Sequence, residues 1–442
     1  MQSRVPLSGL AVVVLALGIL AAWPGKSQAI PAFARKYQTS CQTCHVAFPQ
    51  LTPFGEAFRR NGYRFPSGTD PDVSKQKDIP LGSEGYKKVF PKAVWPGSLP
   101  SEVPLAAIMQ TELLDSPHTK PHMQFDTFGN LFEILAAGTL GETISFFNEV
   151  PIEFEDGDFH VGVERAFAII KPTTLPTVMF RVGRFETGMA NVSEHRGLVG
   201  DYWMLTRGAG VRADSGAAND FSMEPAQQGF EVTGTPGGRF AYTAGLVEGT
   251  AGVPNDAKDF YGRAEYKLGG LRLDGVESGE ASAMSSPQPW LEKSLTLGAF
   301  AYSGKTLLSD AAQEPEDKFY YAGGDLYANA ANFLVRAGYA REHHDAPFEV
   351  ARDTKANVDH VFVEAQHIYY PWLFPVVRYE MFSSKVAPSG AAELSRRDSR
   401  ITPGIVMLVR ANVETIIKAD VEKIGDEKWL VQQVGASLAL VF

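Results

Sequence analysis

Beyond residue 104 the chain alternates between two kinds of side chain with a period of two, the pattern of a β-strand whose two faces differ. The last segment shows it well, because Val434, Ala436, Leu438, Leu440 and Phe442 share one face. Similar runs recur from 132 onward. The body of the chain is therefore predicted to be mainly β.

Charged residues within these runs separate two β architectures. Glu149, Arg336 and Lys418 each place a full charge inside a strand-like run. The interior of a soluble sandwich excludes such charges, which would then have to lie on its solvent face. The water-filled lumen of a membrane barrel accepts them. The charges therefore favour a barrel, with a soluble sandwich as the alternative.

The connections between the runs also alternate in length. Tight ones such as 138–141 and 410–411 alternate with long polar ones such as 186–227 and 271–292, as in outer-membrane barrels. The chain ends on an aromatic residue, Phe442, which is typical of bacterial outer-membrane proteins. We predict an outer-membrane antiparallel β-barrel of about 16 strands over residues 101–442.

Residues 1–29 have the organisation of a secretory signal peptide. Arg4 supplies the positive start, Leu10 to Trp23 is apolar, and Ser27-Gln28-Ala29 forms a small-x-small cleavage site. The alternative is a membrane anchor, for which the apolar stretch is short. The mature chain is predicted to begin at Ile30, outside the cytoplasm.

The segment 30–100 contains Cys41-Gln42-Thr43-Cys44-His45, a C-x-x-C-H motif that holds the only two cysteines of the chain. This spacing attaches c-type haem, with both thiols bound to the porphyrin and His45 as the proximal iron ligand. A structural zinc site would need four ligands, and a thioredoxin-like dithiol would need a βαβ context. One covalent haem c is therefore predicted at Cys41, Cys44 and His45.

Charge divides the chain in the same way. Residues 30–100 carry ten Lys/Arg and five Asp/Glu, whereas the whole chain has a net charge of −10. A basic head and an acidic body attract each other. An acidic body also argues against a nucleic-acid partner.

The residues around the motif resemble the fused cytochrome–porins of bacterial outer membranes, whose best-known members oxidise ferrous iron. The resemblance rests on Phe33-Ala34-Arg35 before the C-x-x-C-H motif and on the run from Pro49 to Tyr63 after it, P-x-L-x-x-F-G-x-x-F-x-x-N-G-Y. It covers about 35 residues, and beyond them only the architecture agrees. The resemblance implies a monohaem segment fused to a barrel, and electron transfer across the outer membrane.

The iron of such a haem needs a second axial ligand, usually His or Met. Neither occurs between Val46 and Ile108, so the barrel is predicted to complete the site and the head to plug or abut the lumen. His122 and Met123 are the preferred candidates, with His118 and Met109 next. Other histidines, His195 among them, remain possible, and a five-coordinate iron is the alternative.

These features predict an electron-transfer protein of the outer membrane. An external donor, with Fe(II) as one candidate, would deliver an electron to the haem, and a periplasmic cytochrome would remove it. Two alternatives remain open: a solute porin with a structural or sensory haem plug, and a peroxidase-like haem enzyme. The sequence does not decide whether the chain is an enzyme, such as a ferrous-iron:cytochrome oxidoreductase.

Overall fold

The computed structural model describes residues 32–66, 74–75, 77–82, 84–92, 98–101, 103–126, 132–155, 158–208, 218–250, 256–276, 288–308, 316–349, 353–387 and 393–442. The predicted signal peptide lies outside these residues.

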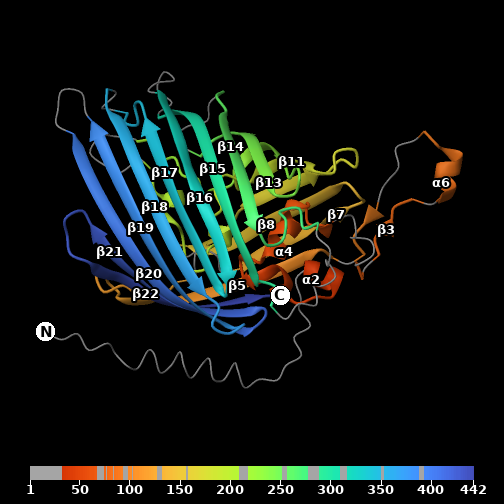
Figure 1. Ribbon diagram of the computed structural model, residues 1–442, viewed down its shortest axis with the longest axis horizontal. Helices are drawn as coiled ribbons and strands as arrows, with labels where there is room; N and C mark the ends of the chain where they lie inside the picture. The colour runs from red at the N-terminus through yellow and green to blue at the C-terminus, as the bar shows by residue number, and fades with distance from the viewer. Residues whose placement is uncertain are drawn as a thin grey trace.

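Within the described chain, sixteen strands close into one antiparallel barrel, as predicted (Figure 1). Each strand pairs with the next along the chain, and the last strand closes the barrel on the first through Val434↔Asp115 to Val441↔Ile108. Two short strands, β6 (Met123–Asp126) and β9 (Asp158–Val161), extend hairpins at the rim. The sixteen are β5 (Leu105–Asp115), β7 (Phe132–Leu140), β8 (Ile144–Glu155), β10 (Arg165–Ile170), β11 (Val178–Phe185), β12 (Gln227–Gly234), β13 (Phe240–Val247), β14 (Asp259–Gly269), β15 (Glu292–Leu307), β16 (Glu316–Ala331), β17 (Phe333–His344), β18 (Lys355–His367), β19 (Leu373–Ala387), β20 (Leu394–Arg410), β21 (Val413–Ile424) and β22 (Leu430–Val441).

The barrel is apolar outside and charged inside, the reverse of a soluble protein. On β19 the side chains of Val377 and Tyr379 are 47% and 38% exposed, whereas those of Arg378 and Glu380 between them are 1% exposed. The period of two places these pairs on opposite faces of the strand. The charges predicted to face a lumen, such as Glu149, do lie inside the barrel, where other protein segments bury them.

The lumen is filled from one end by the long connection between β11 and β12, which we call the inner loop (186–226, described to 208 and from 218). It contains the 3-10 turn η2 (Glu194–Arg196) and the helix α7 (Trp203–Thr206). Charged wall residues satisfy its backbone: Arg378 donates to the carbonyls of Gly200 (2.9 Å) and Asp201 (2.8 Å), and the amide of Trp203 donates to Glu380 (2.7 Å). These contacts fix the loop inside the barrel.

Residues 32–66, which we call the head, occupy the opposite end, where most connections are short. The head consists of α2 (Ala32–Tyr37), α3 (Cys41–Cys44), β1 (His45–Ala47), β2 (Gln50–Leu51) and α4 (Pro53–Arg60), and α2 and α4 appear at that end of the barrel in Figure 1. An arm follows it, with α6 (Glu84–Val89) and the paired strands β3 (Ile79–Pro80) and β4 (Ser98–Leu99). Figure 1 shows α6 standing away from the barrel.

The head is bound to the wall by polar contacts that come mainly from strand ends. Arg64 donates to the carbonyls of Gly141 (2.8 Å) and Ile144 (2.7 Å), and Gln42 donates to that of Pro371 (2.8 Å). Arg60 pairs with the buried Glu265 at 2.5 Å, a direct contact between the basic head and the acidic body. Several independent anchors thus hold the head in one position.

One long connection breaks the predicted alternation of lengths. The connection 270–291 between β14 and β15 lies at the head end, where short turns were expected. Its Asp274 carbonyl accepts a hydrogen bond from Asn61 of the head (2.8 Å), and Leu271 packs against the head's aromatic side chains. The extra length therefore serves to contact the head. Among described residues, no helix is both long enough and apolar enough to cross a membrane.

Candidate functional site

A cavity lies between the head and the barrel wall. The volume that the centre of a water molecule could occupy is about 320 Å³. A single water needs roughly 10–15 Å³ of such volume. The space therefore suits a large organic group. Cys41, Cys44 and His45 of the head line it, and so do wall residues such as Leu135 and Arg165.

The attachment motif forms a single helical turn, α3. Ser40 caps this turn by accepting a hydrogen bond from the amide of Gln42 (3.3 Å), and the backbone turns extended at His45. Both cysteines and the imidazole thereby face the same cavity. This geometry meets the requirement of the predicted haem attachment, in which the two thiols and the proximal ligand must reach one group.

The surroundings of His45 suit an axial ligand. Its Nδ1 lies 3.3 Å from the carbonyl oxygen of Pro49. Because a carbonyl only accepts, Nδ1 carries the proton and Nε2 keeps its lone pair, the arrangement that orients metal-bound histidines. Burial lowers the pKa of His45 to about 4, although the Pro49 carbonyl acts in the opposite direction. The imidazole is therefore neutral at ordinary pH.

The two thiols are poorly suited to act as a dithiol. Burial, together with the neighbouring Cys41, raises the pKa of Cys44 to about 12. Thiol exchange requires the thiolate, which such a pKa disfavours. The alternative of a redox dithiol thus loses support.

Helix α4 packs directly against the motif. Thr52 caps this helix, accepting from the amide of Gly55 (3.1 Å) and donating to the carbonyl of Thr43 (2.8 Å), and Pro53 occupies the first helical turn. Gly55 is required by this packing, because a Cβ built there would lie 2.0 Å from the carbonyl oxygen of Cys44. Helix α4 therefore packs on the backbone of the motif and fixes its position.

Charges on α4 contribute to this arrangement. Burial by itself would raise the pKa of Glu56, but Arg59, Arg196 and Arg60 hold it well below its ordinary value. Glu56 lies in the first turn, where the helix dipole also favours a negative charge. The ionised carboxylate thus stabilises the head.

Aromatic side chains cover the cavity on the head side. Phe54 and Phe58, four residues apart on α4, line the cavity together with Tyr37 and Phe65. Phe54 and Phe65 lie 5.1 Å apart between ring centroids, and Phe33 meets Phe58 edge-on at 5.2 Å. An apolar wall of this kind excludes water from a prosthetic group.

The four predicted distal ligands do not line this cavity. Strand β5 carries the chain away from the head, so His118, His122 and Met123 lie in or beside the β5–β6 turn at the opposite rim, where all three are exposed. Met109, on β5 itself, is 46% exposed. The prediction assumed that residues close to the head in sequence stay close in space, and a strand spanning the barrel prevents this. Among described lining residues, the His and Met side chains besides His45 are His195 and Met179.

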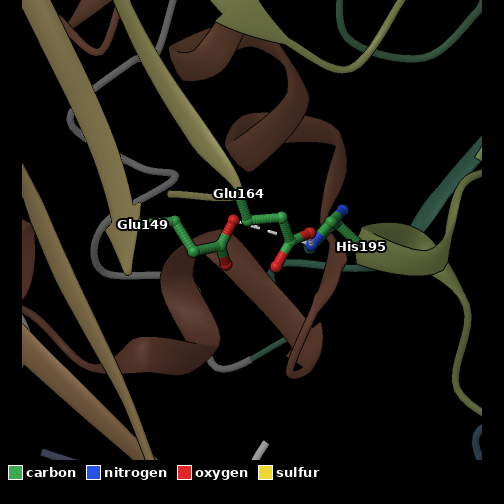
Figure 2. A group of neighbouring side chains, drawn as sticks. All are labelled: Glu149, Glu164 and His195. Carbon is green, nitrogen blue, oxygen red and sulfur yellow. Dashed lines mark ion pairs between the residues drawn. The ribbon is translucent and has the colours of Figure 1, made fainter. Parts of the chain in front are cut away.

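A second polar cluster borders the cavity, and sequence reasoning did not assemble it. His195 of the inner loop places Nε2 3.0 Å from Glu164 Oε1 and 3.7 Å from Glu149 Oε2 (Figure 2). Its Nδ1 lies 3.8 Å from Glu186 Oε2. Burial and Arg165 oppose protonation, yet hydrogen bonds with Glu164 and Glu186 raise the pKa of His195 to about 10. The carboxylates therefore create a negative potential here. Glu149 and His195 were each noted in the sequence, but nothing in the spacing of the cluster residues along the chain pointed to a common site.

Comparison with known proteins supports the barrel. No protein-family model matches the chain, and no curated protein matches it. Among solved structures, an anion-selective porin from Comamonas acidovorans aligns with 12% identity and a TM-score of 0.52, over 76% of this chain and 98% of the porin. The chain has the fold of an outer-membrane porin.

Other porin-like structures align over the same share of this chain. OmpT, an outer-membrane protein of Vibrio cholerae, and Salmonella typhi OmpF in complex with daunomycin each give 97% coverage of their own chains. Their identities are 12% and 13%, with TM-scores of 0.47 and 0.46. The fold rests on the Comamonas porin and on the closed strand order described above.

Proposed function

We propose that this porin-fold protein carries electrons across the bacterial outer membrane through one haem c, held by Cys41, Cys44 and His45 inside the barrel. The observation that carries the proposal is that all three residues face one cavity between the head and the barrel wall. A prosthetic group in this position lies within the barrel that would cross the membrane.

The outward surface of the barrel supports a membrane location. Apolar residues such as Val377 and Tyr379 face outward along strands whose inward residues are charged. Lipid favours this distribution and water does not. In outer-membrane barrels the short turns face the periplasm, so the head and its cavity belong to the periplasmic end.

The chain itself would hold and insulate the group. When bound, haem iron takes up and releases one electron by changing between its ferrous and ferric states. His45 would supply the proximal nitrogen, and the Pro49 carbonyl would orient it. Phe54 and Phe58 would keep water away, which lowers the local dielectric and affects the redox potential.

The occupied lumen favours electron transfer over solute transport. The inner loop enters the lumen from one end and the head from the other, and both bind charged residues of the inner wall. An electron crosses such a barrier by tunnelling, whereas a solute needs an open channel. We propose Fe(II) as the external donor to test first and a soluble periplasmic cytochrome as the acceptor.

A solute porin is the second candidate, because the barrel shares its fold with porins. A peroxidase-like enzyme is the third, since none of the four predicted distal ligands lines the cavity. These candidates differ in conductance and in the spin state of the haem.

The test uses the purified full-length protein. We expect one covalent haem per chain by the pyridine haemochrome assay, none in Cys44→Ser, reduction of the haem by added Fe(II), and little ion conductance in a planar bilayer. Absence of covalent haem would reject the proposal. Haem that Fe(II) leaves oxidised would remove iron as the donor, and high conductance would favour the porin. A high-spin haem that binds peroxide would favour the enzyme.

A further inference from the structure

We propose that Glu149, Glu164 and His195 form a binding site for a divalent transition-metal cation, bordering the same cavity but separate from the haem attachment residues. The site is assembled from three places in the chain: the strand β8, the residue before β10, and the inner loop (Figure 2). Their side chains converge, with all ligand atoms within 4.8 Å of one another.

The spacing of the ligand atoms fits a metal ion. Metal–nitrogen and metal–oxygen bonds of about 2.0–2.2 Å separate neighbouring ligand atoms by roughly 3.0–3.6 Å. His195 Nε2 lies 3.0 Å from Glu164 Oε1 and 3.7 Å from Glu149 Oε2. Small side-chain shifts, together with release of Glu149 Oε2 from its ion pair with Arg165, would complete the coordination.

The surrounding charges favour a cation. Three carboxylates, those of Glu149, Glu164 and Glu186, lie around His195, and the guanidinium groups facing them are those of Arg165 and Arg196. A metal ion binds the neutral imidazole and releases its proton, and the three carboxylates then exceed the two guanidinium groups by one negative charge. Because the donors are carboxylate oxygens and one imidazole nitrogen, without sulfur, the site suits Mn(II), Fe(II) or Zn(II) rather than a soft ion such as Cu(I).

The position of the site allows an ion to reach it. His195 and Glu164 retain 21% and 24% side-chain exposure, so the site is enclosed without being sealed. His195 and Glu149 line the large cavity, and η2 lies beside β2, which pairs with the strand that begins at His45. A cation held here would be close to the attachment motif.

The test measures Mn(II) binding by electron paramagnetic resonance, in which bound Mn(II) loses the six-line signal of the free ion. The full-length protein is first treated with a chelator. We expect one saturable site per chain, and at least about tenfold weaker binding in Glu164→Gln and in His195→Asn. The matched control is Glu248→Gln. Glu248 directly follows β13, its side chain is exposed, and its carboxylate pairs with Lys258 (3.0 Å).

Absence of a saturable site, or a Glu164→Gln variant that binds Mn(II) as tightly as the wild type, would overturn the proposal and leave the cluster as an ion-pair network that anchors the inner loop. A haem spectrum that shifts in His195→Asn without any Mn(II) binding in the wild type would also overturn it, because His195 would then be a haem ligand. The haem content is measured on the same samples. Mn(II) binding without haem would retain the cation site and reject the electron conduit, and the converse result would do the opposite.

Discussion

Substitution of Gly55 by alanine tests the packing of α4 on the attachment motif. Helix propensity alone predicts that Gly55→Ala stabilises α4 by up to about 1 kcal/mol. The structure predicts the opposite, because the new Cβ would lie 2.0 Å from the Cys44 carbonyl oxygen, where real contacts are no shorter than 3.0 Å. The two backbones must therefore separate by about 1 Å, a distance set by this clash.

The magnitude follows from what this separation disturbs. Overpacking of this kind costs about 1–3 kcal/mol. The same carbonyl accepts a hydrogen bond from the amide of Thr52 (2.9 Å), whose weakening adds about 1 kcal/mol. After subtraction of the gain in helix propensity, the head should lose about 1–3 kcal/mol of local stability.

Native-state hydrogen exchange measures this loss. Protection of the head amides, that of Thr52 included, should fall about 5- to 150-fold in Gly55→Ala, while strand amides of the barrel keep theirs. Gly162→Ala is the matched control, because a Cβ at Gly162 meets nothing within 4 Å. Equal or greater protection of the head in Gly55→Ala would refute the reasoning, since propensity would then outweigh the packing.

Three further predictions concern the haem, the pH and the lumen. His122→Ala and Met123→Leu should leave the haem absorption spectrum unchanged, because both side chains are exposed at the far rim; a shifted spectrum in either would restore it as a ligand. Because the pKa of Glu56 is depressed in the folded protein, its ionised carboxylate should stabilise the head above pH 4.5. This stabilisation should be lost as the pH falls below 4.5, where the unfolded chain takes up the proton first. Thermal unfolding of the head should then depend less on acid in Glu56→Gln, and equal acid sensitivity would contradict the assignment. Arg378→Ala should cost about 3–5 kcal/mol, because it leaves buried carboxylates behind, and should release the inner loop and raise bilayer conductance. The exposed Arg397→Ala is the control, and unchanged conductance in Arg378→Ala would mean that this arginine does not hold the loop.

Local sequence patterns were sufficient to predict the strands of the barrel and the haem-attachment turn of the head. The cap of α4 at Thr52 and the inward charges of β19 both follow from residues near one another in sequence. Backbone hydrogen bonding and side-chain alternation depend on residues close together in sequence, so they can be predicted without the tertiary structure. The strand number of about 16 was predicted from the usual size of such barrels, and the closed strand order confirms it.

The lining of the site could not be predicted in the same way. The distal candidates His122 and Met123 were chosen for proximity in sequence, but β5 carries them to the opposite rim. His195 lies 150 residues beyond His45 in the numbering, yet the inner loop returns it to the cavity. Closure of a barrel brings together residues from distant strands, and no periodic pattern records which ones meet.

By itself, the sequence determined that this chain forms strands with one charged face, and that Cys41, Cys44 and His45 share one turn. Only the tertiary structure decided that the head and the inner loop enter the lumen from opposite ends, leaving one cavity between them. The physical reason is that strand patterns depend on neighbours two residues apart, whereas the filling of the lumen depends on contacts such as Arg60 with Glu265 that form only when the barrel closes.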